Sequence, residues 1–247
     1  MGSAFSWHNV TRRAPGARQM LSLAGDHAAL TAFLVLLAFA AIAAPQFYDP
    51  FNLKVVGEQA AILGIITVGQ SLVLLVRGFD LSVGTVAGVM AMTIVLVGQG
   101  GRTPLVVAIL MGIALAAIVG LINAWLVVGR GVPPFVATLG VLIMVEGARF
   151  VVSQGQASGE IPEFVTFLGR GLVGVIPTAI LAWAIIVASV ASLLHLTPYG
   201  RALYASGSNP DAALLSGLRT GLVIGSAYVL CSVCAALAGI VPVSYTH

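Results

Sequence analysis

The sequence has 247 residues, of which 59% are hydrophobic and only 8% are charged, and its formal net charge is +3. A soluble domain carries about 25% charged residues, so this composition excludes a water-soluble fold of this size. Apolar runs of about 20 residues recur along the chain and predict membrane-spanning helices, whereas the alternating strands of a membrane β-barrel do not appear. The sequence therefore predicts an all-α, polytopic membrane protein.

Seven spans are predicted after an N-terminal tail of residues 1–27: Ala28–Ala44, Val55–Val76, Leu81–Val97, Leu105–Val128, Phe135–Val152, Val173–Leu194 and Leu222–Val241. Their lengths suit a hydrocarbon core about 30 Å thick. Residues 28–241 are therefore expected to form one transmembrane domain. The tail is not interpreted as a cleaved signal peptide, because no small-residue cleavage site follows a short apolar core.

The basic residues of the short loops predict a cytoplasmic N-terminus. In that orientation the cytoplasmic side holds seven of the eleven Lys and Arg residues: Arg12, Arg13, Arg18, Arg77, Arg130, Arg201 and Arg219. The outer side holds the other four: Lys54, Arg102, Arg149 and Arg170. The loop 196–220 then lies in the cytoplasm, and the polar, glycine-rich loop Ser153–Gly171 is expected to be a solvated connector outside.

An acidic residue, Asp80, stands between two apolar runs in the stretch Gly78–Gly84. A charged residue is costly in lipid and needs a reason for being there. One role is an N-cap of the third span, in which the carboxylate accepts the amides of Ser82 and Val83. A second is pairing with Arg77. A third is a place on a transport pathway at an interrupted helix, where Gly78 and Gly84 permit close backbone approach.

Other polar residues lie within the predicted spans. Uncharged members of this group are expected to bond across helices or to line the path of a hydroxyl-rich solute: Gln70, Ser71, Asn123 and Thr138. Glu146 lies one helical turn from Arg149, so the two are expected to form an ion pair. Cys231 and Cys234 lie in an apolar helix without evident partners and are interpreted as packing residues.

The loop 196–220 contains a predicted short helix outside the bilayer. Asn209 is a good N-cap, Pro210 suits the first helical position, and Asp211 suits the positive end of a helix. Gly217 can end the helix. A two-turn helix is marginal in water unless something packs on it, so it either rests on its own protein or docks on a cytoplasmic partner. Its apolar face is predicted from Ala212 and Leu215, with Leu218 near its end.

The chain has a single lysine, Lys54, which is not part of a phosphate-binding G-x-x-x-x-G-K-[ST] loop. No H-E-x-x-H or G-x-S-x-G motif occurs either. The sequence therefore predicts a protein that is not an enzyme, without a cofactor or metal. If transport is driven by ATP, another polypeptide hydrolyses it.

Three stretches resemble the ribose/xylose-type permeases of ABC sugar importers, in the order that this family shows them. They are Gly64–Gly84, which includes GIITVGQ and GFDLSVG, Gly120–Gly140, which includes GLINAWLV and PFVATLG, and Tyr199–Gly217. The third is similar to the family's segment that docks on the ATPase. The form FDLSVG resembles the sugar branch of the family more than the branched-chain amino acid branch.

The resemblance implies a ten-span permease fold in the bacterial inner membrane and transport by alternating access. It implies three protein partners: a cytoplasmic ABC ATPase subunit, a periplasmic sugar-binding protein and a second permease subunit, with a homodimer expected. Nucleic acid is not an expected partner. The docking residues are expected to be Asn209, Pro210, Asp211, Ala212, Leu215 and Gly217. The pathway or helix-break residues are expected to be Gly78, Asp80, Ser82, Gly84, Gln70 and Asn123.

The sequence also departs from the family. Arg77 stands where glycine is common, and Glu146 stands where arginine is common. The chain ends after its seventh predicted span, and residues 242–247 resemble a translated adapter tail, so a C-terminally truncated permease is expected. The alternatives are a proton-coupled carrier that uses Asp80 or Glu146, or a fragment that does not transport. A membrane enzyme would need a nucleophile or metal constellation that the sequence does not show.

Overall fold

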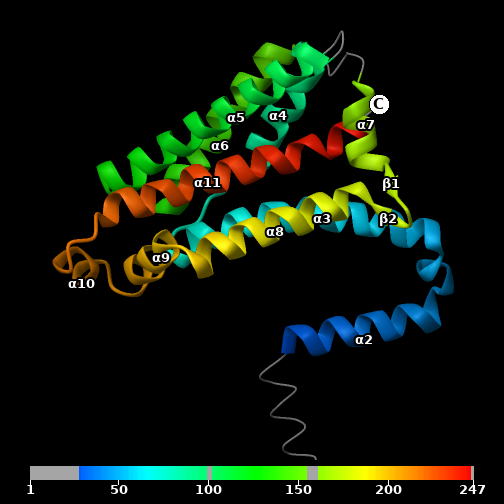
Figure 1. The fold of residues 1–247 in the computed structure, drawn as a ribbon, viewed down its shortest axis with the longest axis horizontal. Coiled ribbons are helices and arrows are strands. Elements are labelled where there is room, and N and C mark those ends of the chain that lie inside the picture. The colour runs from blue at the N-terminus through cyan, green and yellow to red at the C-terminus, as the bar shows by residue number, and fades with distance from the viewer. Residues whose placement is uncertain (1–27, 99–101, 155–160, 246–247) are drawn as a thin grey trace, which may run out of the picture. The chain divides into compact units, whose positions relative to one another are not determined.

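The computed structural model describes residues 28–98, 102–154 and 161–245 (Figure 1). The predicted tail 1–27 and the last two residues of the 242–247 tail lie outside this description. The described residues are helical almost throughout, which confirms the predicted all-α class. The chain divides into two compact units, the first ending at Leu53 and the second beginning at Lys54.

The first unit contains α2 (Ala28–Ala43), a 3₁₀ helix (Pro45–Tyr48) and the start of α3 (Pro50–Leu75). Its turn is held by polar side chains that meet backbone carbonyls. The Tyr48 hydroxyl donates to the Leu37 carbonyl at 2.6 Å, and the Asn52 amide donates to the Phe47 carbonyl at 2.8 Å. The Phe47 carbonyl lies near the end of the 3₁₀ helix, where carbonyls lack an intrahelical partner, whereas the Tyr48 bond ties the turn back to the interior of α2.

The second unit continues α3 and adds six long or intermediate helices and several shorter elements. The longer helices are α4 (Val83–Val97), α5 (Arg102–Ala124), α6 (Pro134–Ser153), α8 (Thr178–Leu196), α9 (Pro198–Ser208) and α11 (Thr220–Ile240). The shorter elements are a π-helical turn (Trp125–Gly129), α7 (Glu163–Arg170), the strands β1 (Leu172–Val173) and β2 (Ile176–Pro177), α10 (Pro210–Leu215) and a 3₁₀ helix (Pro242–Tyr245).

Within the described residues, five helices are long and apolar enough to cross a membrane: Pro50–Leu75, Thr103–Gly129, Pro134–Ser153, Thr178–Leu196 and Thr220–Ile240. They correspond to five of the seven predicted spans. The other two, α2 and α4, are apolar but have only 16 and 15 residues. A straight helix of 15 residues is about 22 Å long, which is shorter than the hydrocarbon core.

The core of the second unit lies where α11 packs against α4 and α5 (Figure 1). Small residues let these helix backbones approach closely. A β carbon added at Gly120 of α5 would lie 2.7 Å from the Val229 Cα of α11, and one added at Gly69 of α3 would lie 2.8 Å from the Cys234 Cβ. Such contacts are the usual basis of helix association in membranes. Cys231 and Cys234 are buried and free, as expected of packing residues.

The sixth predicted span begins five residues too early. Residues 172–177 form a two-stranded hairpin, and α8 begins only at Thr178, after Pro177. The loop Ser153–Gly171 is also not a plain connector, because Glu163–Arg170 forms α7. Figure 1 shows α7 and the hairpin at one end of α8 and α9 at its other end.

Candidate functional site

A break between α3 and α4 interrupts the bundle at residues 76–82. α3 ends in a left-handed turn: Arg77 has φ 61°, its amide donates to the Leu74 carbonyl at 2.9 Å, and the Gly78 amide donates to the Val73 carbonyl at 2.9 Å. This pattern is the Schellman motif, in which the left-handed position is most often glycine. The break exposes backbone groups inside a membrane protein, where each must find a partner.

The Asp80 carboxylate, which is 1% exposed, is the centre of the buried polar network at this break. Its Oδ1 accepts hydrogen bonds from the Ser82 amide at 2.8 Å and from the Ser82 hydroxyl at 2.6 Å. Asn123, which reaches the break from α5, donates from Nδ2 to both carboxylate oxygens at 3.3 Å and to Ser82 Oγ at 2.9 Å. Three buried side chains from two distant parts of the sequence therefore hold one another.

Two further side chains satisfy the backbone of the break. With its amide nitrogen facing the Asp80 carbonyl, Gln70 of α3 donates to that carbonyl at 3.2 Å and accepts from the Asp80 amide at 3.1 Å. Thr138 of α6 accepts from the Leu81 amide at 3.1 Å and donates to the Pro134 carbonyl at 2.9 Å. The predicted polar contacts across the bundle are confirmed for Gln70, Asn123 and Thr138. Ser71 instead bonds within its own helix, to the Val68 carbonyl at 2.7 Å.

The structure separates the roles that the sequence left open for Asp80. The predicted N-cap role of Asp80 is wrong, because α4 begins at Val83 and its N-cap residue is Ser82. The predicted bond from the Ser82 amide to Asp80 is confirmed, but the second donor is the Ser82 hydroxyl and not the Val83 amide. The predicted pairing with Arg77 is wrong: the Arg77 Nη2 donates to the Ser208 carbonyl at 2.6 Å. A β carbon at Gly78 would collide with the Tyr228 hydroxyl, whereas one at Gly84 would meet nothing within 4 Å. Close approach is thus required at Gly78 only.

The short helix predicted in the loop 196–220 is present as α10. The Asn209 side chain accepts from the Ala212 amide at 3.1 Å, Pro210 is the first helical residue, and Asp211 lies in the first turn. Gly217 has φ 85° and ends the helix. These features confirm the predicted cap, start and stop. Leu215 is 90% exposed, so the structure leaves the predicted apolar face uncovered at this residue.

A helix that was not predicted from the sequence, α9, attaches α10 to the bundle. Leu203 and Ser206 of α9 are buried against the bundle. A β carbon added at Gly207 of α9 would collide with the Leu75 carbonyl at the end of α3. Tyr199 lies 2.9 Å from the Ser226 hydroxyl of α11. Burial raises the pKa of the Tyr199 phenol, so this group stays protonated at neutral pH. α9 is therefore fixed to both α3 and α11.

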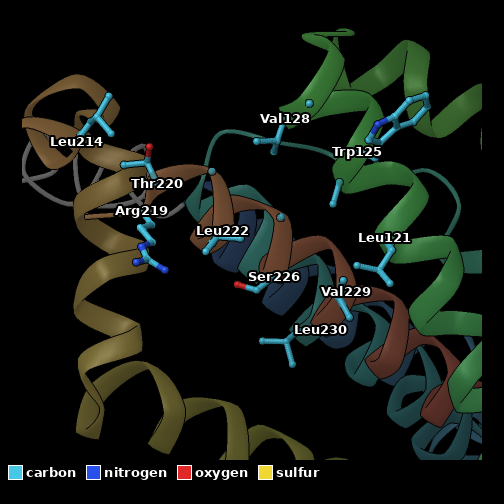
Figure 2. Close-up of a pocket in the computed structure, with 14 residues that line it drawn as sticks. Leu121, Trp125, Val128, Leu214, Arg219, Thr220, Leu222, Ser226, Val229 and Leu230 are labelled. Carbon is cyan, nitrogen blue, oxygen red and sulfur yellow. The ribbon is translucent and has the colours of Figure 1, made fainter. Parts of the chain in front are cut away.

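An apolar groove of about 870 Å³ lies beside α10 (Figure 2). Figure 2 shows Leu121 of α5 with Trp125 and Val128 of the following π-helical turn on one side of the groove. Leu222, Ser226 and Val229 of α11 lie on the other side. Its charged lining residue is Arg219. A hydroxyl-rich solute needs several hydrogen-bond partners, so this groove does not suit a sugar.

The predicted ion pair between Glu146 and Arg149 is confirmed: Arg149 Nε donates to Glu146 Oε2 at 3.2 Å, and its Nη2 contacts the other carboxylate oxygen. Both side chains are partly exposed, and a β carbon at Gly88 of α4 would lie 3.1 Å from the Arg149 guanidinium. The pair therefore lies between α6 and α4, apart from the network at Asp80.

These features define a class, the multi-pass helical membrane proteins built around an interrupted span. A family model described as the permease component of branched-chain amino acid transport systems matches residues 55–247. The chain belongs to this family of transport permeases. This confirms the resemblance found in the three sequence motifs and the prediction that the chain is a permease component and not an ATPase.

Curated relatives agree with this assignment. The chain is 31% identical to the ribose import permease of Escherichia coli over 226 residues, which cover 89% of this chain and 69% of the relative. It is 31% identical to the fructose import permease of Rhizobium meliloti over 83% of this chain and 59% of the relative. It is 33% identical to the ribose import permease of Bacillus subtilis over 86% of this chain and 66% of the relative. The chain thus spans about three fifths to two thirds of its relatives' length, and no solved structure matches it.

Proposed function

We propose that this chain is the membrane-spanning permease subunit of an ATP-driven importer for a monosaccharide or a similar small polar solute. The names of its relatives support a sugar, since two of them import ribose and one imports fructose. The FDLSVG form of the helix break supports the same branch of the family.

The observation that carries the proposal is the exposed helix α10. It is preformed by its own cap and stop, it lies outside the spans, and it presents Leu215 and Ala212 to the surroundings. A six-residue helix is not stable alone, and an exposed apolar face on it fits a groove on a partner protein. The partner in this proposal is the cytoplasmic ABC ATPase subunit. The docking residues are Asn209, Pro210, Asp211, Ala212, Leu215 and Gly217.

The proposed orientation places the N-terminus and the segment 196–220 in the cytoplasm of a bacterium, with the transmembrane domain 28–241 in the inner membrane. The loop arginines support it, since Arg77, Arg130, Arg201 and Arg219 then lie on the cytoplasmic side. A periplasmic sugar-binding protein delivers the solute from the other side. A second permease subunit, a copy of this chain in our proposal, completes the path between them.

The mechanism is alternating access. ATP binding closes the two ATPase subunits and displaces α10, and only a difference in contacts between the two states lets ATP shift the equilibrium. The contacts of α9 support a route for this displacement. When α10 moves, α9 moves with it because the two helices pack together. Gly207 and Ser208 of α9 in turn contact Leu75 and Arg77 at the helix break. Movement of α10 then reaches the helix break and its partners Asn123 and Thr138.

The docking contact is tested with Leu215→Asp, which places an unpaired charge in the proposed interface. We expect loss of co-purification with a co-expressed sugar-importer ATPase subunit and loss of ATP-dependent uptake, while membrane insertion is unchanged. Ser216→Asp is the matched control, because it adds the same charge at the neighbouring exposed position of the same helix end. Undiminished co-purification of the ATPase with Leu215→Asp would refute docking through α10.

The orientation is tested with single cysteines at Ser208 and Thr166, which lie near opposite ends of α8 and are exposed. An impermeant thiol reagent added outside intact cells is expected to label Thr166→Cys and not Ser208→Cys. The reverse pattern would invert the topology. Uptake that survives ATP depletion but collapses with an uncoupler would replace the ATP-driven mechanism by a proton-coupled one.

A further inference from the structure

Exposed apolar side chains continue beyond the spans onto α7 and the hairpin. Their members are Phe164 and Phe167 of α7 and Leu172, Val173, Val175 and Ile176 of the hairpin. Val175, at the hairpin tip, is 92% exposed. Gly174, with φ 64°, takes the first central position of the two-residue turn and leaves Val175 as the second. We call this surface the α7–hairpin patch; apolar groups of this kind are costly in water.

The helix α7 has three faces of different character. Successive residues are rotated by about 100°, so Glu163, Thr166 and Arg170 share one polar, exposed face. Val165 and Gly169 share the face that is buried against the protein. Phe164 and Phe167 lie between these two faces and are exposed. A helix with one side on protein, one side polar and one side aromatic is typical of the membrane surface, where water and lipid meet it on adjacent sides.

The patch stands at the level of the membrane boundary. α8 has 19 residues and is therefore about 29 Å long, close to the thickness of the hydrocarbon core. The hairpin ends at Pro177, the residue before α8, so it begins where the hydrocarbon ends. The Thr178 hydroxyl contacts the carbonyls of Phe167, Leu168 and Gly171 at 2.7, 3.0 and 3.1 Å, which fixes α7 to the same level.

The patch also continues the partly exposed surface of α8. Beyond Thr178 and Ala179, which are buried, the residues of α8 are exposed or partly exposed, as expected of a span with lipid on part of its surface. At the end of α7, Lys54 of α3 donates to the Arg170 carbonyl at 3.1 Å, and it also lies 3.7 Å from the carboxylate of the buried Glu58. Basic side chains at this level extend toward the headgroups while their apolar stems stay in the membrane. A basic side chain thus lies beside the end of α7, next to the apolar hairpin, as at a bilayer surface.

We propose that α7 lies in the lipid headgroup layer and that the α7–hairpin patch inserts into the edge of the hydrocarbon. The ligand is the bilayer surface itself. Phe164 and Phe167 contact acyl chains, Val175 enters the hydrocarbon, and Glu163, Thr166 and Arg170 face water. This surface anchor fixes the tilt of α8, whose other end leads into α9.

The test uses single cysteines at Phe164, Phe167 and Val175, with Thr166→Cys as the matched control on the polar face of the same helix. The native Cys231 and Cys234 are buried, and unsubstituted protein gives their background labelling. Each variant carries a nitroxide label in vesicles of phosphatidylethanolamine and phosphatidylglycerol. We expect the labels at Phe164, Phe167 and Val175 to collide more with oxygen than with a water-soluble nickel complex, and the label at Thr166 to show the reverse preference.

A label at Val175 that is as accessible to the nickel complex as the one at Thr166 would overturn the proposal. A protein partner would give a different result: the Val175 label would be accessible to nickel in vesicles alone and protected only when a periplasmic binding protein is added. Phe167→Trp provides an independent readout in case the cysteine variants fold poorly, since brominated lipids quench a tryptophan in their acyl layer. No added quenching relative to the unsubstituted protein would likewise contradict insertion.

Discussion

The Arg77 guanidinium donates a hydrogen bond to the Ser208 carbonyl, 2.6 Å away, and so joins the helix break to the end of α9. The two residues are 131 positions apart in the sequence. Arg77 makes this contact from the left-handed backbone conformation, which costs a residue other than glycine about 1–2 kcal/mol. Arg77 thus adopts an unfavourable backbone conformation and gains a hydrogen bond to the proposed docking segment.

Substitutions at Arg77 separate these two effects. Arg77→Gly loses the bond to Ser208 but relieves the left-handed strain, whereas Arg77→Ala loses the bond and keeps the strain. We expect Arg77→Ala to be less stable than Arg77→Gly by about 1 kcal/mol. Denaturant unfolding in detergent measures the difference. Equal stability of the two variants would show that residue 77 is not held in the left-handed conformation.

An exchange of Asp80 and Asn123 tests the buried network. Asp80→Asn turns an amide toward the Asn123 amide, and Asn123→Asp turns a second carboxylate toward Asp80, so each single change is unfavourable. A buried hydrogen bond to a charged group contributes about 1.5–3 kcal/mol, and each single variant should lose an amount of this order. The double variant Asp80→Asn/Asn123→Asp restores one carboxylate and one amide and should recover part of it.

The double-mutant cycle on unfolding free energies gives the coupling between the two positions. Recovery in the double variant confirms that Asp80 and Asn123 act as a pair in the folded protein. If the losses of the two single variants simply add, the pair does not form, and Asp80 is held by Ser82 alone.

The two glycines that frame the motif should respond differently to alanine. Gly78→Ala forces a methyl group against the Tyr228 hydroxyl and to 2.8 Å from Val73 Cγ1, and overpacking of this kind costs about 1–3 kcal/mol. Gly84→Ala meets open space in the first turn of α4 and should be neutral or stabilising by about 0.5–1 kcal/mol. Thermal unfolding of both variants in detergent provides the comparison. A Gly84→Ala variant as unstable as Gly78→Ala would contradict this assignment.

The contact between Tyr199 and Ser226 should fix α9 to α11. Tyr199→Phe and Ser226→Ala each remove one partner and should each cost about 0.5–1.5 kcal/mol. Because they remove the same contact, the double variant should cost little more than the larger single effect. The release of α9 is measured by the rate at which a protease cleaves the 196–220 segment in membranes. If the effects of the two single variants on this rate simply add in the double variant, the two residues do not share a contact.

Features fixed by local chemistry could be predicted from the sequence. Asn209 and Gly217 delimit α10 because a capping side chain and a left-handed glycine act within a few residues of themselves. Glu146 and Arg149 pair because they are one turn apart on α6. The apolar runs locate the spans for the same reason, since a helix in lipid must form all of its backbone hydrogen bonds within its own segment.

Features that depend on distant contacts could not be predicted. α9 contains Gly200 and Gly207, which lower its intrinsic helix propensity, and it is stabilised by the burial of Leu203 and Ser206. The sixth span was predicted to begin too early because the hairpin residues are apolar and directly precede the apolar residues of α8. Only Gly174 and Pro177 distinguish the hairpin from the helix that follows it. The contact of Asp80 with Asn123 could likewise not be predicted, because nothing local connects the two residues.

The spacing of the network also sets an order for biosynthesis. Asp80 receives its bonds to Oδ1 from Ser82, which is made almost at the same time, but its Oδ2 depends on Asn123, 43 residues later. At about 5–20 residues per second, the ribosome delivers Asn123 roughly 2–9 s after Asp80. α4 is made during that interval, while one carboxylate oxygen of Asp80 still lacks its amide. The nascent helix pair therefore depends on water or on the insertion machinery at Asp80 until α5 enters the membrane.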